Sequence, residues 1–174
     1  MSTLVEDLLL LARLDQSREM EREPVDLKTL IEESVTSAQA AGPDHPISLA
    51  LPDDDLFVLG DSHRIHQVIS NLLANARTHT PTGTPITVTA QQDESGTRIS
   101  VADEGPGLSP EDQNRIFERF YRADPSRVRN GGEGSGLGLS IVDAVMKAHG
   151  GSVSVTSELG KGATFTLFFP MDES

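Results

Sequence analysis

Short segments in which apolar and polar residues alternate constrain the fold of this chain most strongly. In residues 86–90 apolar residues alternate with threonines, and the same alternation recurs near residues 99–101, 153–155 and 165–169. Such alternation is typical of strands with one buried and one solvated face, whereas central parallel strands read as continuous apolar runs. The pattern therefore predicts a two-layer α/β (α+β) sandwich, in which helices cover one face of a mixed, mostly antiparallel sheet.

Apolar residues at helical spacing predict the helices of this sandwich. The strongest signal follows Asp61 and consists of apolar side chains at helical intervals: Ile65, Val68, Ile69, Leu72, Leu73 and Ala76. A second helix begins at the N-cap residue Asp26 and ends before Gly42, and a third runs from about Gly138 to His149. A half-buried strand at residues 47–51 and a short return strand at residues 57–59 are also expected, with a turn between them.

Residues 3–20 predict a helix whose apolar surface is too wide to be buried against a single neighbouring element. Leucines lie on more than one face of residues 3–20, so we expect a partner helix or a dimer, with packing on its own domain as the alternative. The charged stretch 18–24 ends in Pro24 and is interpreted as a hinge. The longest apolar run, Leu8–Ala12, is too short to cross a bilayer, and no signal peptide is expected.

Charge and composition exclude several classes of function. The net charge of −13 argues against general nucleic-acid binding, which depends on neutralising phosphates. The chain has no cysteine, which rules out disulfides, thiolate metal sites and thiol catalysis. Five arginines nevertheless fall within residues 115–129, and eleven of the fifteen glycines within residues 105–162. A cationic, glycine-rich segment of this kind can hold a small anion such as a nucleotide.

Three segments contain residue types that can carry chemistry. The glycines of GSGLG, residues 134–138, precede a helix and can turn their amides toward a phosphate, although the segment is neither a Walker loop nor a dinucleotide fingerprint. Asp103 opens DEGPG after a strand, where a carboxylate can accept a hydrogen bond from an amine on a flat ring. Asn71 and Asn75 share a helix face and can offer amide oxygens to Mg²⁺. Taken singly, these segments are also compatible with a flexible loop, a plain turn and two surface amides.

Taken together, the segments resemble a known family. The order is NLLANA on a helix, DEGPG after a strand, GSGLGL before a helix and GKGAT at the opening of the last strand. This resembles the order found in the ATP-binding domain of bacterial sensor histidine kinases. Residues 116–122, IFERFYR, are similar to the phenylalanine box of these kinases. The resemblance covers roughly residues 26–170 and implies the Bergerat-type fold that the kinases share with gyrase and MutL.

The resemblance implies a role for each matching residue. Asn75 would bind Mg²⁺ with Asn71 as its upstream catalytic partner, and Asp103 would recognise the adenine amine of ATP. Arg122 would act near the phosphates, within a lid formed by residues 119–137. The remaining residues expected around the nucleotide are His79, Gly105, Gly107, Tyr121, Gly134, Ser135, Gly136, Leu137, Gly138 and Thr164.

The chain departs from the family pattern at one position. The family often has Lys or Arg three residues after the metal-binding asparagine, where this chain has Thr78. Arg77 is adjacent, but it points about 100° away on a helix, so lid arginines are expected to replace that phosphate contact. Asn71 occupies the position at which related ATPases have a glutamate that activates water. An asparagine cannot take up a proton at neutral pH, so hydrolysis is expected to be slow, which suits transfer to a histidine.

The histidine that accepts the phosphoryl group in the family is missing. The family acceptor is usually followed by an acidic residue, whereas the five histidines here precede Pro, Arg, Gln, Thr and Gly. His79 is expected to line the site or to face solvent, and the other four to lie on the surface. The chain is therefore expected to be a fragment, with residues 1–23 forming the tail of a dimerisation hairpin plus a hinge, and residues 24–174 forming the catalytic domain.

The resemblance also implies partners and alternatives. The partners are the dimerisation and phosphoacceptor domain of the same kinase and a response regulator, and the whole protein is expected to be a homodimeric inner-membrane sensor with this portion in the cytoplasm. A nucleotide-binding regulatory module is the first alternative, favoured by Thr78. An ATPase or serine kinase of the same fold is the second, and Asn71 argues against the ATPase.

Overall fold

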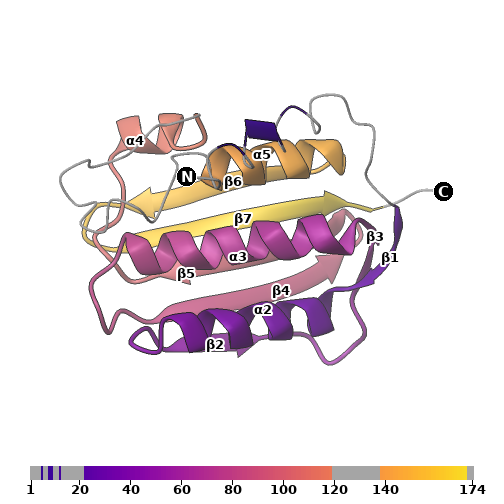
Figure 1. The fold of residues 1–174 in the computed structure, drawn as a ribbon, viewed down its shortest axis with the longest axis horizontal. Coiled ribbons are helices and arrows are strands. Elements are labelled where there is room, and N and C mark those ends of the chain that lie inside the picture. Colours follow the sequence, from indigo (N-terminus) through magenta and orange to yellow (C-terminus); the bar gives the residue numbers. More distant parts are fainter. Residues whose placement is uncertain (1–4, 6–7, 10–11, 13–21, 119–137, 172–174) are drawn as a thin grey trace.

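The main body of the protein is a five-stranded sheet with helices on one face (Figure 1). The computed structural model describes residues 5, 8–9, 12, 22–118 and 138–171. The strands of the main sheet are β2 (Ile47–Ala50), β4 (Ile86–Asp93), β5 (Gly96–Asp103), β6 (Ser152–Glu158) and β7 (Gly162–Pro170). Their spatial order is β2-β4-β5-β7-β6. Only β2 and β4 are parallel among these neighbours, which confirms the predicted mixed, mostly antiparallel sheet.

The helix layer is centred on α3. The described helices with known bounds are α2 (Leu27–Ala41), α3 (Ser62–Thr78), α4 (Pro110–Arg115) and α5 (Gly138–Ala148). α3 packs between α2 and α5 on the sheet (Figure 1). The side chain of Asp61 caps α3 by accepting hydrogen bonds from the backbone N–H groups of His63 and Arg64, at 3.1 and 3.3 Å. All six apolar residues that the helical spacing singled out on α3 are buried.

The short return strand expected at residues 57–59 is confirmed as β3 (Phe57–Gly60), and its partner is a strand that the sequence analysis did not predict. β3 does not pair with β2; it forms a separate two-stranded sheet with β1 (Glu23–Asp26). β1 begins at the end of the stretch that was interpreted as a hinge, and Val25 within it is buried. Pattern alone identifies a strand and says nothing about which strand it pairs with.

Two other details of the fold differ from the sequence prediction. β2 was expected to be half-buried, yet Leu49 is 40% exposed, because β2 is one of the two edge strands of the main sheet and has a neighbour on one side only. α4 was not predicted. Its signal was present, however, since the Ser109 hydroxyl accepts from the N–H of Asp112 at 3.1 Å and Pro110 occupies the first turn.

The described residues of the N-terminal segment give a partial view of the expected first helix. Val5, Leu8, Leu9 and Ala12 are the described residues before Arg22, and Val5, Leu8 and Leu9 are exposed. Within the described part of the chain, no helix combines the length and apolarity needed to cross a membrane.

His149 was expected to lie on the surface, and this expectation was wrong. It is buried and connects the end of α5 to the start of α3. The side chain is 5% exposed. Its Nδ1 donates to the carbonyl oxygen of Val145 at 2.8 Å, and its Nε2 accepts from the N–H of Asp61 at 3.1 Å. The neutral ring therefore satisfies both nitrogens, and burial lowers the pKa of His149.

This arrangement predicts a loss of stability at mildly acidic pH. The unfolded chain protonates this histidine near pH 6.5, whereas the folded chain does so only at lower pH. The unfolded state thus binds more protons in that window, and the free energy of unfolding falls as the pH falls through it. Denaturant titrations at pH 7 and pH 5 should show a smaller decrease for His149→Phe than for the wild type. His63→Phe, at an exposed position, should follow the wild type, and identical pH profiles for all three proteins would contradict the assignment.

Candidate nucleotide-binding site

Asp103 is the last residue of β5 and lies in a pocket at the end of the sheet. Its neighbours across the sheet are Ile86 on β4 and Ala163 on β7. One carboxylate oxygen, Oδ1, accepts a hydrogen bond from the N–H of Gly105 at 2.9 Å, so the carboxylate has a defined orientation. The central position of β5 in the sheet places this acceptor on a rigid support.

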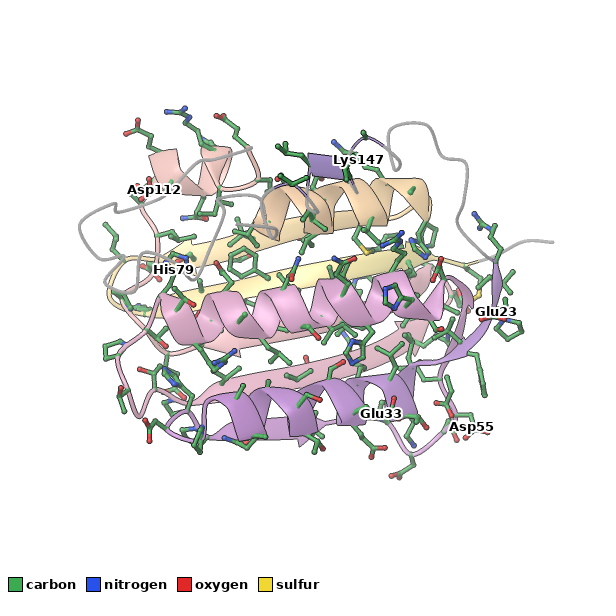
Figure 2. All side chains as sticks on the ribbon, viewed as in Figure 1. Glu23, Glu33, Asp55, His79, Asp112 and Lys147 are labelled. Atoms are coloured by element: carbon green, nitrogen blue, oxygen red, sulfur yellow. The ribbon has the colours of Figure 1, made fainter. Side chains whose placement is uncertain are left out.

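The pocket collects residues from five parts of the chain. Asn75 and His79 come from the end of α3, where Figure 2 labels His79, and Asp103 comes from the end of β5. The remaining lining residues come from the loop after β5, the end of α4 and the start of β7: Pro106, Gly107, Leu108, Ile116, Ala163 and Phe165. Most of these are apolar, so the pocket offers an apolar enclosure with a few polar groups: Asn75, His79 and Asp103.

Burial sets the protonation properties of Asp103. Partial burial raises the pKa of its carboxyl, while hydrogen bonds from the N–H groups of Gly105 and Ala163 and the charge of nearby His79 act in the opposite direction. A carboxylate in an apolar pocket, with one oxygen still able to accept, is suited to a flat ring that carries an amine donor. Asp103, Asn75 and Gly107 were predicted to act together, and the structure brings them together.

The loop that follows Asp103 is braced against the β6–β7 turn. The Ser157 hydroxyl donates to the carbonyl oxygen of Gly162 at 2.7 Å and accepts from the N–H of Leu108 at 2.8 Å. The side-chain amide of Gln113 bridges the carbonyl oxygens of Leu108 and Ser157, at 3.1 and 3.0 Å. Gly107 has a φ of +78°, and a Cβ there would collide with the carbonyl oxygen of Glu158. Sequence analysis missed Ser157 and Gln113, because both act across long sequence separations.

Asn71 connects α3 to the start of α5. Its side-chain Nδ2 donates to the carbonyl oxygen of Gly138 at 3.3 Å. Gly138 is the last residue of the glycine segment and the first of α5, with open space at the position of a Cβ. This hydrogen bond therefore connects α3, the helix that carries Asn75, to the end of the glycine segment.

Arg77 points away from the pocket, as its position on the helix predicted. A Cβ on Gly42 would overlap the Arg77 side chain, so the guanidinium lies against the end of α2. Its Nε is buried and has no hydrogen-bond partner among the described residues. Thr78 is exposed. Arg77 therefore does not reach the pocket, and the neutral Thr78 brings no positive charge to it.

The structure does not bring Thr164 to the pocket. Ala163 and Phe165 line it, and Thr164, between them on β7, lies on the opposite face of the sheet, level with Ala102 and Thr156. The expected hydroxyl near the base is thus replaced by the methyl group of Ala163.

Several predicted site residues lie outside the part of the chain that the structure describes. They are Tyr121, Arg122, Gly134, Ser135, Gly136 and Leu137, together with the rest of the expected lid over residues 119–137.

The histidines are distributed differently from the prediction. His79 lines the pocket and is also exposed, so it combines the two alternatives that the sequence left open. His63 is exposed and His66 half-buried. His45, which was expected on the surface, is only 7% exposed, and its Nε2 lies 3.0 Å from the Thr80 hydroxyl.

Comparisons with known proteins identify the family of this chain. Residues 60–173 match the family model described as histidine kinase-, DNA gyrase B-, and HSP90-like ATPase. The probable sensor histidine kinase TcrY of Mycobacterium tuberculosis is 48% identical over 169 residues, which cover 97% of this chain and 35% of that protein. The chain thus spans about a third of the length of such curated relatives.

Solved structures share the fold as well. The mycobacterial sensor histidine kinase MprB is 30% identical, with a TM-score of 0.74 over 86% of this chain and 97% of that one. Full-length ShkA in complex with AMPPNP is 34% identical, with a TM-score of 0.77 over 97% of this chain and 36% of that one. The family match, the shared fold and the arrangement around Asp103 lead to one conclusion: this chain belongs to the histidine kinase-, DNA gyrase B- and HSP90-like ATPase family, and its relatives there are sensor histidine kinases.

Proposed function

We propose that the pocket binds the adenine of ATP, and that the chain is the catalytic part of a two-component sensor histidine kinase. The observation that supports this most is the oriented, half-buried carboxylate of Asp103 in an apolar pocket that also contains Asn75. Asp103 would accept a hydrogen bond from the adenine amine. Ile116 and Phe165 would pack against the ring, and Gly107 would let it approach the backbone.

The residues present fit a magnesium ion bound together with the nucleotide. In the described residues, no group of three His, Cys, Asp or Glu side chains could hold a metal alone. Mg²⁺ in ATP-dependent enzymes usually takes one or two protein oxygens and completes its shell with phosphates and waters. Asn75 offers such an oxygen, and Asn71, oriented through Gly138, lies one turn before it. When bound, Mg²⁺ would neutralise charge on the phosphates.

The proposed reaction transfers the γ-phosphoryl group of ATP to a histidine outside this chain. The P–O bond between the β- and γ-phosphates breaks, a bond to the histidine nitrogen forms, and ADP leaves. Positioning and charge neutralisation dominate such transfers. Arg122 and the glycine segment 134–138 would supply contacts to the phosphates that Arg77 and Thr78 do not. Asn71 cannot act as a base toward water at neutral pH, which would favour transfer over hydrolysis.

The proposed organisation follows from the resemblance and the relatives. Residues 1–23 would form the end of a dimerisation hairpin and a hinge, and residues 24–174 the catalytic domain. The acceptor histidine would lie on that hairpin in a homodimer, and a response regulator would take the phosphoryl group next. The whole protein would be a sensor of the inner membrane, with this portion in the cytoplasm.

Asp103→Asn should change nucleotide selectivity. The asparagine can keep the bond from the N–H of Gly105, but it presents a weaker acceptor, or an N–H group, to the adenine amine. We expect ATP affinity to fall by about 1–3 kcal/mol and GTP affinity to change little. Partial burial disfavours the charged carboxylate in the folded protein. Replacing it with a neutral amide should therefore not lower the melting temperature. Calorimetry with both nucleotides measures this, and equal losses for ATP and GTP would contradict the role of Asp103.

A phosphotransfer assay tests the proposal directly. The chain is mixed with a separately produced dimerisation hairpin that carries the acceptor histidine, and with ATP labelled at the γ-phosphate. Label on the histidine, lost when that histidine is replaced by Gln, supports the proposal. A folded chain that binds ATP and labels no histidine would favour a regulatory nucleotide-binding module instead. The orientation of Arg77 against Gly42 favours that alternative, because it keeps this cation out of the pocket.

A further inference from the structure

We propose that His45 is a positioning residue for adenine recognition, acting through Thr80 and Gly105 on the carboxylate of Asp103. The inference rests on the proposed function of Asp103. His45 lies on the loop between α2 and β2, and it does not line the pocket itself. What connects it to the pocket is a series of contacts, each of which restricts the next group.

The backbone of His45 is held from both sides. Its N–H donates to the carbonyl oxygen of Gly42 at 3.2 Å, and its carbonyl oxygen accepts from the side-chain amide of Gln39 at 2.8 Å. The other end of the same amide, Oε1, accepts from the N–H of Ile47 at 3.1 Å. The imidazole is therefore presented from a fixed piece of backbone into the interior, where only 7% of the residue remains exposed.

The imidazole holds Thr80 by its hydroxyl group. Nε2 of His45 lies 3.0 Å from the Thr80 hydroxyl and 3.4 Å from the Thr80 carbonyl oxygen. The Thr80 hydroxyl donates its single hydrogen to the carbonyl oxygen of Ala76 at 2.7 Å. Both Thr80 oxygens therefore act as acceptors toward the ring, which assigns the hydrogen to Nε2. The hydroxyl is thus fixed by one donor and one acceptor.

Fixing the hydroxyl also fixes the methyl group of Thr80. Threonine is branched at Cβ, so one χ1 angle sets the directions of both groups. The methyl group points at Gly105 so closely that a Cβ on residue 105 would collide with it. Rotation of Thr80 would therefore change the space available to Gly105.

Gly105 passes this restriction to the carboxylate. Its N–H donates to Oδ1 of Asp103 at 2.9 Å, and a Cβ on this residue would meet both the Thr80 methyl group and that same Oδ1. A shift of Gly105 would change the length or angle of this hydrogen bond and release the carboxylate from its orientation. His45 thus limits how far the adenine acceptor can turn.

A double-mutant cycle separates positioning from a general loss of stability. His45→Phe removes the donor and keeps a flat ring. We expect the dissociation constant for ATP, measured by calorimetry on the whole chain, to rise about three- to tenfold, with a smaller change for GTP. In the Asp103→Asn background the same substitution should change the ATP constant much less, because the side chain that Gly105 then positions is a weaker acceptor for the adenine amine. His45→Gln, which keeps an N–H donor near the position of Nε2, should recover most of the affinity.

Two further variants keep the test decisive. Thr80→Ser retains the hydroxyl and lacks the methyl group, so it should weaken ATP binding in the same way even if His45→Phe does not fold. His63→Phe, at an exposed histidine on α3, should bind ATP like the wild type. Unchanged ATP affinity in folded Thr80→Ser, or equal losses from His45→Phe in the wild-type and Asp103→Asn backgrounds, would overturn the proposal. Failure of the wild type to bind ATP would instead overturn the proposed function, so the two failures are distinguishable.

Discussion

Asn75→Ala should reduce phosphotransfer to the acceptor histidine by about 100-fold or more, equivalent to about 2.7 kcal/mol of lost transition-state stabilisation. Asn75 is the pocket residue on α3 that offers an amide oxygen, and its side chain is half-buried at the helix end rather than part of the apolar stripe. Because the stripe is left intact, the melting temperature should change little. Initial rates of label transfer at saturating ATP, together with thermal unfolding, measure both quantities.

The matched variant at this position is Asn75→Asp. An aspartate offers a carboxylate oxygen at the same place, which Mg²⁺ also accepts, so this variant should retain far more transfer than Asn75→Ala. Raising the magnesium concentration should partly recover the alanine variant, and chelation should abolish transfer in the wild type. An alanine variant with wild-type rates at every magnesium concentration would remove Asn75 from the proposed metal site.

Gly162→Ala should destabilise the protein far more than Gly83→Ala. Both glycines have a φ of +93°, so any L-residue pays the same left-handed strain of about 1–2 kcal/mol. A Cβ at Gly83 meets nothing within 4 Å, whereas a Cβ at Gly162 collides with the carbonyl oxygen of Asp103. Overpacking of this kind adds about 1–3 kcal/mol. The excess loss in Gly162→Ala therefore reports the close approach of β7 to Asp103, the proposed adenine acceptor.

Denaturant unfolding of the two glycine variants measures this difference. ATP affinity gives a second reading, because displacement of the Asp103 backbone should weaken binding in Gly162→Ala and leave it unchanged in Gly83→Ala. Equal destabilisation of both variants would show that β7 can move away from the carbonyl oxygen of Asp103. The close approach of Gly162 would then not hold Asp103 in place.

The elements that carry the site were predictable because their signals are local. The six apolar positions of α3 and the alternation in β4 and β5 depend on residues close in sequence, and they place Asn75 and Asp103 correctly on a helix and at a strand end. The fold class followed from the same patterns and is confirmed. The order of the motifs along the chain then supplied the family.

Features that depend on distant partners were not predictable in this way. Histidine burial is one case, since His149 is satisfied by Asp61, 88 residues away, and His45 by Thr80, 35 residues away. The pairing of β1 with β3 is another. Thr164 shows how strictly strands alternate, because a displacement by one residue moves a side chain to the other face of the sheet.

The position of Asp103 on the central strand has a consequence for dynamics. β5 has a hydrogen-bonded neighbour on each side, so its amides should exchange with solvent only when the whole sheet opens. The part of the pocket that would recognise the base is thus organised before any ligand arrives. Nucleotide should slow deuterium uptake along β4, β5 and β7 by one common factor, set by ligand concentration and affinity rather than by local tightening.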